Sequence, residues 1–94
     1  MGYTLLQSSE IVAESSKGIK REFKQALDLA KEAGLTWLVS RCLRGLADSA
    51  ELFLDDWPQA REYFEQALSV ASQAGDVYQE AAAYADIASH YIDQ

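Results

Sequence analysis

The stretch Asp56–Gly75, DWPQAREYFEQALSVASQAG, decides the fold of this chain because the sequence contains it twice. An earlier copy, REFKQALDLAKEAG, lies 41 residues before it and ends at Gly34. The identical residues of the two copies are Phe23, Gln25, Ala26, Leu27, Ala30, Ala33 and Gly34, which correspond to Phe64, Gln66, Ala67, Leu68, Ala71, Ala74 and Gly75. Repetition at a fixed period is typical of stacked helical hairpins, so a repeated helix–helix unit is predicted.

Length and composition favour one small all-α domain that spans residues 1–94. The chain has a single proline and is rich in Ala, Leu, Glu and Gln, which are good helix formers. No apolar run approaches the ~20 residues that a membrane-spanning helix needs, and the start, MGYTLLQSSE, lacks the basic and apolar regions of a secretion signal. A cytoplasmic protein with no membrane partner is therefore expected.

The net charge of −7 argues against nucleic acid as a partner, because phosphates repel an acidic surface. The charge is unevenly distributed: residues 17–44 hold seven basic residues against three acidic ones, whereas residues 62–94 hold six acidic residues and no Lys or Arg. Two interpretations remain open. The charges either form solvated helix faces, or they direct head-to-tail stacking and contact with oppositely charged neighbours.

Apolar residues at three- and four-residue spacing predict five helices, at about residues 3–15, 17–33, 36–54, 57–74 and 77–93. Ser15, Ser16 and Gly18 are expected to separate the first two helices, with Ser16 as the N-cap of the second. Turns of two to four residues require neighbouring helices to run antiparallel.

The other predicted helix ends carry recognisable caps. Thr36 is the expected N-cap of the third helix, and Asp56 and Asp76 each precede a glutamine by three residues, which resembles a capping box. Gly34 and Gly75 are expected to end helices in the left-handed conformation. The glycines are thus interpreted as residues of helix ends and not as a phosphate-binding loop.

Residues capable of catalysis are few, so neither an enzyme nor a cofactor is predicted. Cys42 is the only cysteine and lies among leucines, which favours a packed side chain, although Arg41 and Arg44 leave a reactive thiol open. His90 is the only histidine, so no two-histidine metal site is possible, and it is interpreted as a surface or partly packed residue. Three tyrosines near the C-terminus have the spacing of packing residues: Tyr78, Tyr84 and Tyr91.

The pattern of small and large residues resembles the tetratricopeptide repeat family, in its subclass with long repeats. The first helix of that repeat is matched by Leu43, Leu46, Ala47 and Ala50 and then by Tyr84, Ile87, Ala88 and Tyr91; the second helix is matched by Ile19, Phe23, Ala26 and Leu27 and then by Ala60, Phe64, Ala67 and Leu68. The chain departs from the family at Ile19, at Ala50 and in lacking the proline that ends many repeats. The resemblance implies a short right-handed α-solenoid.

In this family the first helix of each pair lines a concave groove that holds a protein or peptide partner. The corresponding positions here are Tyr3, Gln7, Glu10, Arg41, Arg44, Asp48, Glu51, Ala82, Ala85 and Ser89. The resemblance therefore implies a protein-binding scaffold. Arg41 and Arg44 are expected to pair with a carboxylate or phosphate of the ligand, unless Arg44 pairs internally with Asp48.

A second functional hypothesis is a self-associating structural or regulatory module within a larger multidomain protein. Two and a half repeats leave both ends of the array uncovered, whereas repeat proteins usually protect their ends with polar caps. The last predicted helix has no partner helix after it in the sequence, so it is the first candidate for a homo-oligomer contact, and the first helix is the second candidate.

Overall fold

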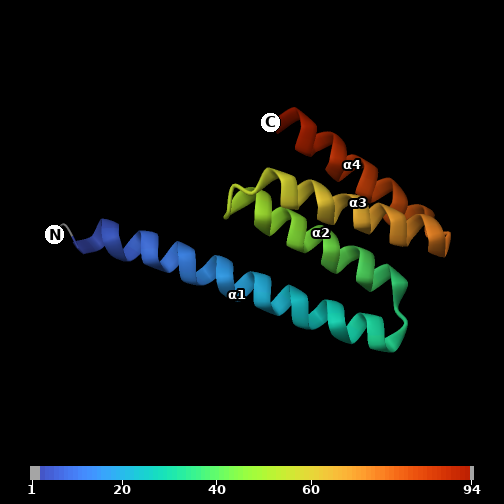
Figure 1. The fold of residues 1–94 in the computed structure, drawn as a ribbon, viewed down its shortest axis with the longest axis horizontal. Helices are drawn as coiled ribbons and strands as arrows, with labels where there is room; N and C mark the ends of the chain where they lie inside the picture. The colour runs from blue at the N-terminus through green and yellow to red at the C-terminus, as the bar shows by residue number, and fades with distance from the viewer. Residues whose placement is uncertain (1–2, 94) are drawn as a thin grey trace.

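Four α-helices make up the part of the chain that the structure describes (Figure 1). The structure is a computed structural model, and it describes the backbone of residues 3–93 and the side chains of residues 17–92. The helices are α1 (Tyr3–Ala33), α2 (Thr36–Leu52), α3 (Trp57–Ala74) and α4 (Val77–Asp93). No strand occurs among these residues, which confirms the all-α fold class.

The predicted division of residues 3–33 into two helices is wrong, because α1 is one continuous helix of 31 residues. Ser15, Ser16 and Gly18 therefore lie inside a helix, and no helix begins directly after Ser16. Serine and glycine each disfavour a helix interior by only about 0.5–1 kcal/mol, and no proline is present to remove a backbone donor. The count of four helices in place of five follows from this difference.

The helix ends confirm most of the predicted caps. The Asp56 side chain accepts a hydrogen bond from the backbone N–H of Gln59 at 3.2 Å, and the Asp76 side chain accepts one from the backbone N–H of Gln79 at 3.1 Å. Gly34 and Gly75 each have a φ of +69°, the left-handed conformation that ends α1 and α3.

The two ends of α2 differ from the prediction. At its start, Leu35 and not Thr36 occupies the N-cap position, and no side chain caps it. At its end, α2 stops at Leu52 and not at residue 54, because the chain turns through Asp55, whose φ is +51°. The Asp55 carboxylate accepts a hydrogen bond at 2.7 Å from the indole Nε1–H of Trp57, which fixes this turn.

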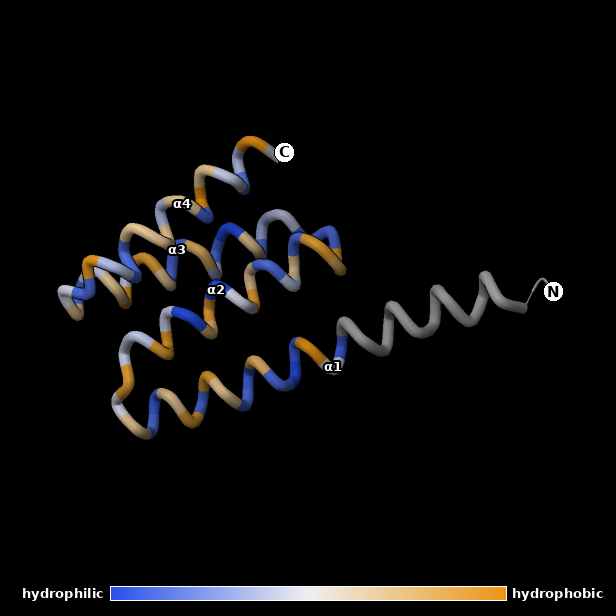
Figure 2. The backbone as a smooth tube through the Cα atoms, turned by 180° about the vertical axis from the view of Figure 1, so that it is seen from behind, coloured by the Kyte–Doolittle hydropathy of each residue, from blue (hydrophilic) through white to orange (hydrophobic). Residues whose placement is uncertain are grey.

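Consecutive helices pack side by side in the order α1, α2, α3, α4, and α2 also contacts α4 (Figure 1). The array is flat and elongated, with extents of 54 × 32 × 18 Å. Hydropathy alternates along each helix in the described part of the chain (Figure 2), as expected for helices with one buried and one solvated side. Helix α2 is therefore the central element.

Small residues bring α2 and α3 close together. Ala47 on α2 and Ala60 and Ala67 on α3 are fully buried, and they flank Phe64, which is 1% exposed. The buried Ser40 hydroxyl donates a hydrogen bond at 3.0 Å to the Ala67 carbonyl, which links α2 to the backbone of α3. Since alanine lets helices approach closely, these residues set the spacing of the central pair.

The two repeated phenylalanines both pack against the helix that follows their own. The Phe64 ring on α3 lies 5.7 Å from the His90 ring on α4. The Phe23 ring on α1 covers Gly45 on α2 so closely that a Cβ added at Gly45 would overlap the ring. Gly45 lies within α2, so the prediction that the glycines sit at helix ends is wrong for this residue, which permits close contact between α1 and α2.

Gly45→Ala and Gly18→Ala should change stability in different directions. Both lie inside helices, where alanine is favoured over glycine by about 0.8–1 kcal/mol. A Cβ at Gly18 meets only the tip of Arg21 at 4.0 Å, whereas one at Gly45 overlaps the Phe23 ring. Chemical denaturation should therefore show Gly45→Ala to be about 1–3 kcal/mol less stable than Gly18→Ala. Equal stability of the two variants would contradict the contact between Phe23 and Gly45.

Candidate functional site: a cleft across α1, α2 and α4

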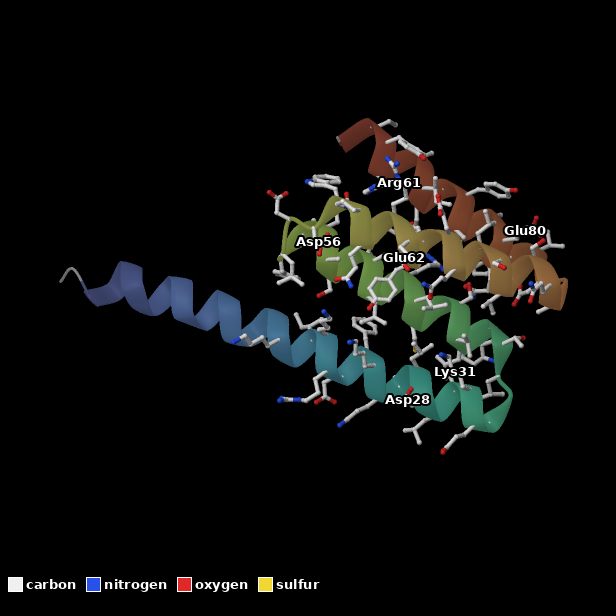
Figure 3. The ribbon with its side chains drawn as sticks, in the orientation of Figure 1. Asp28, Lys31, Asp56, Arg61, Glu62 and Glu80 are labelled. Carbon is white, nitrogen blue, oxygen red and sulfur yellow. The ribbon has the colours of Figure 1, made fainter. Side chains whose placement is uncertain are left out.

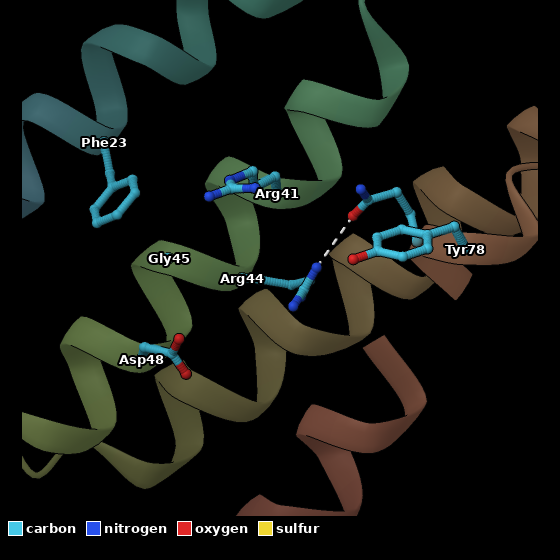
Figure 4. A pocket seen from close by; sticks show the side chains of 7 residues that line it. Phe23, Arg41, Arg44, Gly45, Asp48 and Tyr78 are labelled. Carbon is cyan, nitrogen blue, oxygen red and sulfur yellow. Dashed lines mark hydrogen bonds between the residues drawn. The ribbon is translucent and has the colours of Figure 1, made fainter. Parts of the chain in front are cut away.

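A cleft of about 300 Å³ opens where α2 is flanked by α1 and α4 (Figure 4). Its lining residues are Phe23 from α1, Arg41, Arg44, Gly45 and Asp48 from α2, and Tyr78 and Gln79 from α4. The residues of α2 recur every three or four positions, so they share one face of that helix. Three of the predicted groove residues, Arg41, Arg44 and Asp48, are therefore brought together in one hollow.

Arg44 is held in place by α4. Its guanidinium donates from Nε to the Asp86 carboxylate at 2.6 Å and from Nη1 to the Gln79 side-chain oxygen at 3.1 Å. The side chains of Arg44 and Asp86 are 24% and 27% exposed, so this pair is partly shielded from water. The internal partner of Arg44 is thus Asp86 and not Asp48, and the pair joins α2 to α4 across the floor of the cleft.

Asp48 lies next to this pair, and its carboxyl group is surrounded by other acids. Although part of its side chain reaches solvent, partial desolvation raises the pKa of Asp48 to about 6, and repulsion from the carboxylates of Asp86 and Glu51 adds to the increase. The Arg44 guanidinium acts in the opposite direction. Asp48 is consequently the group in the cleft whose charge changes near neutral pH.

Arg41 is the cation in the cleft that is left for a ligand. Its side chain is exposed, and it forms no ion pair or hydrogen bond with another residue in the described part of the chain. Phe23 and Tyr78 lie on the two sides of α2, and Tyr78 is 77% exposed. The cleft therefore combines one available guanidinium with aromatic surface on either side.

His90 and Glu51 form a second polar contact, farther along the α2–α4 contact. The His90 Nδ1 atom lies 3.3 Å from the Glu51 carboxylate, and its ring is 5.1 Å from the Trp57 ring. His90 is 1% exposed, so its interpretation as a surface or partly packed residue is wrong. Glu51 was predicted to line the groove, but its side chain is only 11% exposed and faces His90.

Three further predicted groove residues, Ala82, Ala85 and Ser89, do not line the cleft. Ala82 is half-buried, whereas Ala85 and Ser89 are exposed on α4. The side chains of Tyr3, Gln7 and Glu10 lie outside the described residues.

Three exposed tyrosines on α4 also differ from the prediction that they pack internally. Tyr78, Tyr84 and Tyr91 are 77%, 57% and 52% exposed. They have the spacing of packing residues, but in the described part of the chain no helix follows α4 to cover them.

Sequence reasoning missed Phe23, Gly45, Tyr78, Gln79 and Asp86 as parts of this site. Gln79 and Asp86 lie on α4 seven residues apart, and seven residues are two helical turns, so both can meet Arg44. That spacing was visible in the sequence. The side of α4 that faces α2 was not, because it depends on how the two hairpins pack.

Cys42 is buried, and burial raises the pKa of its thiol against the influence of Arg41, which does not favour a reactive thiolate. Residues 17–92 contain no group of three or more His, Cys, Asp or Glu side chains placed to hold a metal ion. None of the described helices has the length and apolar character needed to cross a bilayer.

Comparisons of the chain with models of protein families, with curated proteins and with solved structures found no match. The function proposed below therefore depends on the geometry of the cleft.

Asp48→Asn should stabilise the protein at neutral pH and have little effect at acidic pH. Because the folded state raises the pKa of Asp48 from 3.8 to about 6, the folded state binds the proton more tightly. The contribution of the protonated Asp48 carboxyl to stability is complete below pH 3.8 and is lost as the pH rises through 6. Denaturation at pH values on both sides of this range should show a gain of at most about 1 kcal/mol at the higher pH, because solvent screens an exposed group.

The control for this measurement is Asp28→Asn on α1, outside the cluster around Asp48. A gain from Asp48→Asn that is the same at both pH values, or the same as for Asp28→Asn, would contradict the electrostatic description of the cleft.

Proposed function

We propose that this chain is a binding module similar to tetratricopeptide repeats, and that it holds a segment of a partner protein in the cleft on α2. In this proposal the repeated hairpins form a short right-handed α-solenoid whose concave side is the cleft. The protein acts by binding in the cytoplasm and carries out no catalysis. The observation that carries the proposal is the convergence of Arg41, Arg44 and Asp48 in one hollow with aromatic side chains on both sides.

The charged residues of the cleft have different tasks in this proposal. Arg44 is already bonded to Asp86 and Gln79, so it shapes the floor and keeps α4 in position. Arg41 has its donors available, and its planar guanidinium suits a carboxylate of the partner. Asp48 is placed to accept a hydrogen bond from the partner's backbone or from a basic side chain.

The aromatic residues supply apolar contact area. Phe23 is half-buried and Tyr78 largely exposed, so a ligand side chain laid against them removes apolar surface from water without moving a helix. The ligand that fits best is therefore a peptide segment with an acidic residue next to an apolar or aromatic one. Such a segment matches both the available guanidinium and the flanking rings.

Arg41→Ala should weaken peptide binding about tenfold or more, because it removes a charge-assisted hydrogen bond from the complex. A peptide selected on the unaltered protein from a random library would serve as the probe, with affinity measured by fluorescence anisotropy. Arg21→Ala is the matched control, because Arg21 is an exposed arginine on α1 whose side chain is 70% exposed.

Selection of peptides whose affinity is unaffected by Arg41→Ala and by Tyr78→Ala would contradict the cleft as the binding site. An equal loss of affinity with Arg21→Ala would show that net charge and not the cleft governs binding. Arg44→Ala is unsuitable for this test, because it leaves Asp86 without its partner and is expected to loosen α4.

A further inference from the structure

Because the sequence repeats every 41 residues, residues on the outer helices α1 and α4 can be compared with the equivalent buried residues on the central helices α3 and α2. In the central pair, the α2 residues Leu43, Ala47 and Ala50 and the α3 residues Ala60 and Ala67 are all buried, with exposures of at most 4%. Each of these residues has a counterpart 41 positions away, on α4 or on α1. Those counterparts show what the two ends of the array lack.

On α4 the counterparts form an exposed aromatic surface, here called the α4 face, made of Tyr84, Ala88 and Tyr91. Tyr84 and Tyr91 correspond to Leu43 and Ala50 but are 57% and 52% exposed. Ala88 corresponds to Ala47 and is exposed as well. The residues that α2 buries in the central pair are therefore open to solvent on α4.

On α1 the counterparts form an apolar surface, here called the α1 face, made of Ile19, Ala26 and Leu29. Ile19 and Ala26 correspond to the fully buried Ala60 and Ala67 but are only half-buried. They line an apolar hollow of about 460 Å³ together with Glu22 and Phe23. Leu29, which corresponds to the half-buried Val70, is 65% exposed.

Through the repeat, the α4 face is equivalent to the α2 side of the α2–α3 interface, and the α1 face is equivalent to the α3 side. Within the described residues, the α4 face belongs to an α2-like helix that has no α3-like partner, and the α1 face belongs to an α3-like helix that has no α2-like partner. Because α1 and α4 lie at opposite edges of the flat array (Figure 1), one molecule cannot bring its own two faces together.

The charges near the α1 face and on α4 are also complementary. Between residues 17 and 33, α1 holds five basic residues against three acidic ones, whereas α4 holds Glu80, Asp86 and Asp93 and no Lys or Arg. Lys31 and Glu80 mark the two sides of the array in Figure 3. Bringing α4 of one molecule to residues 17–33 of another therefore places an acidic helix beside the basic half of α1.

We propose that the occupant of the α1 face is the α4 face of a second copy of this chain. Packing of these two helices forms a helix pair between molecules that reproduces the α2–α3 pair. The contact is heterologous, so each molecule in a row uses its α1 face on one side and its α4 face on the other. This contact leaves the cleft residues Arg41 and Asp48 outside the interface, whereas Phe23 borders both the α1 hollow and the cleft.

Sedimentation velocity and light scattering of the full chain test the proposal directly. The mean mass is expected to rise above the 10.4 kDa of one chain as concentration increases. It is expected to fall again at high ionic strength, because the attraction between α4 and the basic residues 17–33 of α1 is then screened. A mass that stays at one chain across the range would overturn the proposal.

Variants that spoil one face each distinguish this contact from any other. Leu29→Glu disrupts the α1 face and Tyr84→Glu the α4 face, and both residues are largely exposed, so the monomer fold tolerates the changes. Each variant alone should be monomeric, with self-association weakened about tenfold or more. An equal mixture of the two should form a complex of two chains, since one α4 face and one α1 face remain intact.

Leu52→Glu is the matched control, because Leu52 is a 73% exposed leucine at the end of α2 that belongs to neither face. It should associate like the unaltered chain. A mixture of Leu29→Glu and Tyr84→Glu that stays monomeric, or self-association that survives either change, would overturn the head-to-tail contact.

Discussion

The close approach of α2 to its two neighbours is the constraint on which the rest of the structure depends. Towards α3 the approach is permitted by Ala47, Ala60 and Ala67, whose buried side chains are single methyl groups. Towards α1 it is permitted by Gly45, which lets the Phe23 ring lie directly against the backbone. Since larger residues at these positions would force the helices apart, the flat array follows from small side chains on α2 and α3.

The same packing creates the cleft. With α2 held between α1 and α3, its remaining face carries Arg41, Arg44 and Asp48 at helical spacing, and α4 closes one side through the hydrogen bonds of Asp86 and Gln79 to Arg44. One arginine is thereby used to build the site and the other is left to contact a ligand. Two arginines only three residues apart thus differ in role because only one of them faces α4.

Part of this structure was predictable from the sequence because it depends on local rules. The caps at Asp56 and Asp76 and the left-handed Gly34 and Gly75 follow from turn and helix-end chemistry. The continuous α1 is not evident from helix-end signals, because Ser15, Ser16 and Gly18 resemble a helix break but disfavour a helix only weakly. The burial of His90 was missed because it requires Trp57 and Phe64 to pack around one point on α4, which is a matter of tertiary packing.

A nuclear Overhauser measurement on the labelled protein in solution tests the repeated packing of the two phenylalanines most directly. If each repeated phenylalanine packs against the helix that follows its own, the Phe23 ring protons must give strong cross-peaks to the α-protons of Gly45, and the Phe64 ring must give cross-peaks to the His90 ring. Observation of both sets would support the repeated packing of hairpins. Cross-peaks from Phe64 without any from Phe23 to Gly45 would contradict it, and the cleft beside α1 would then lose its structural basis.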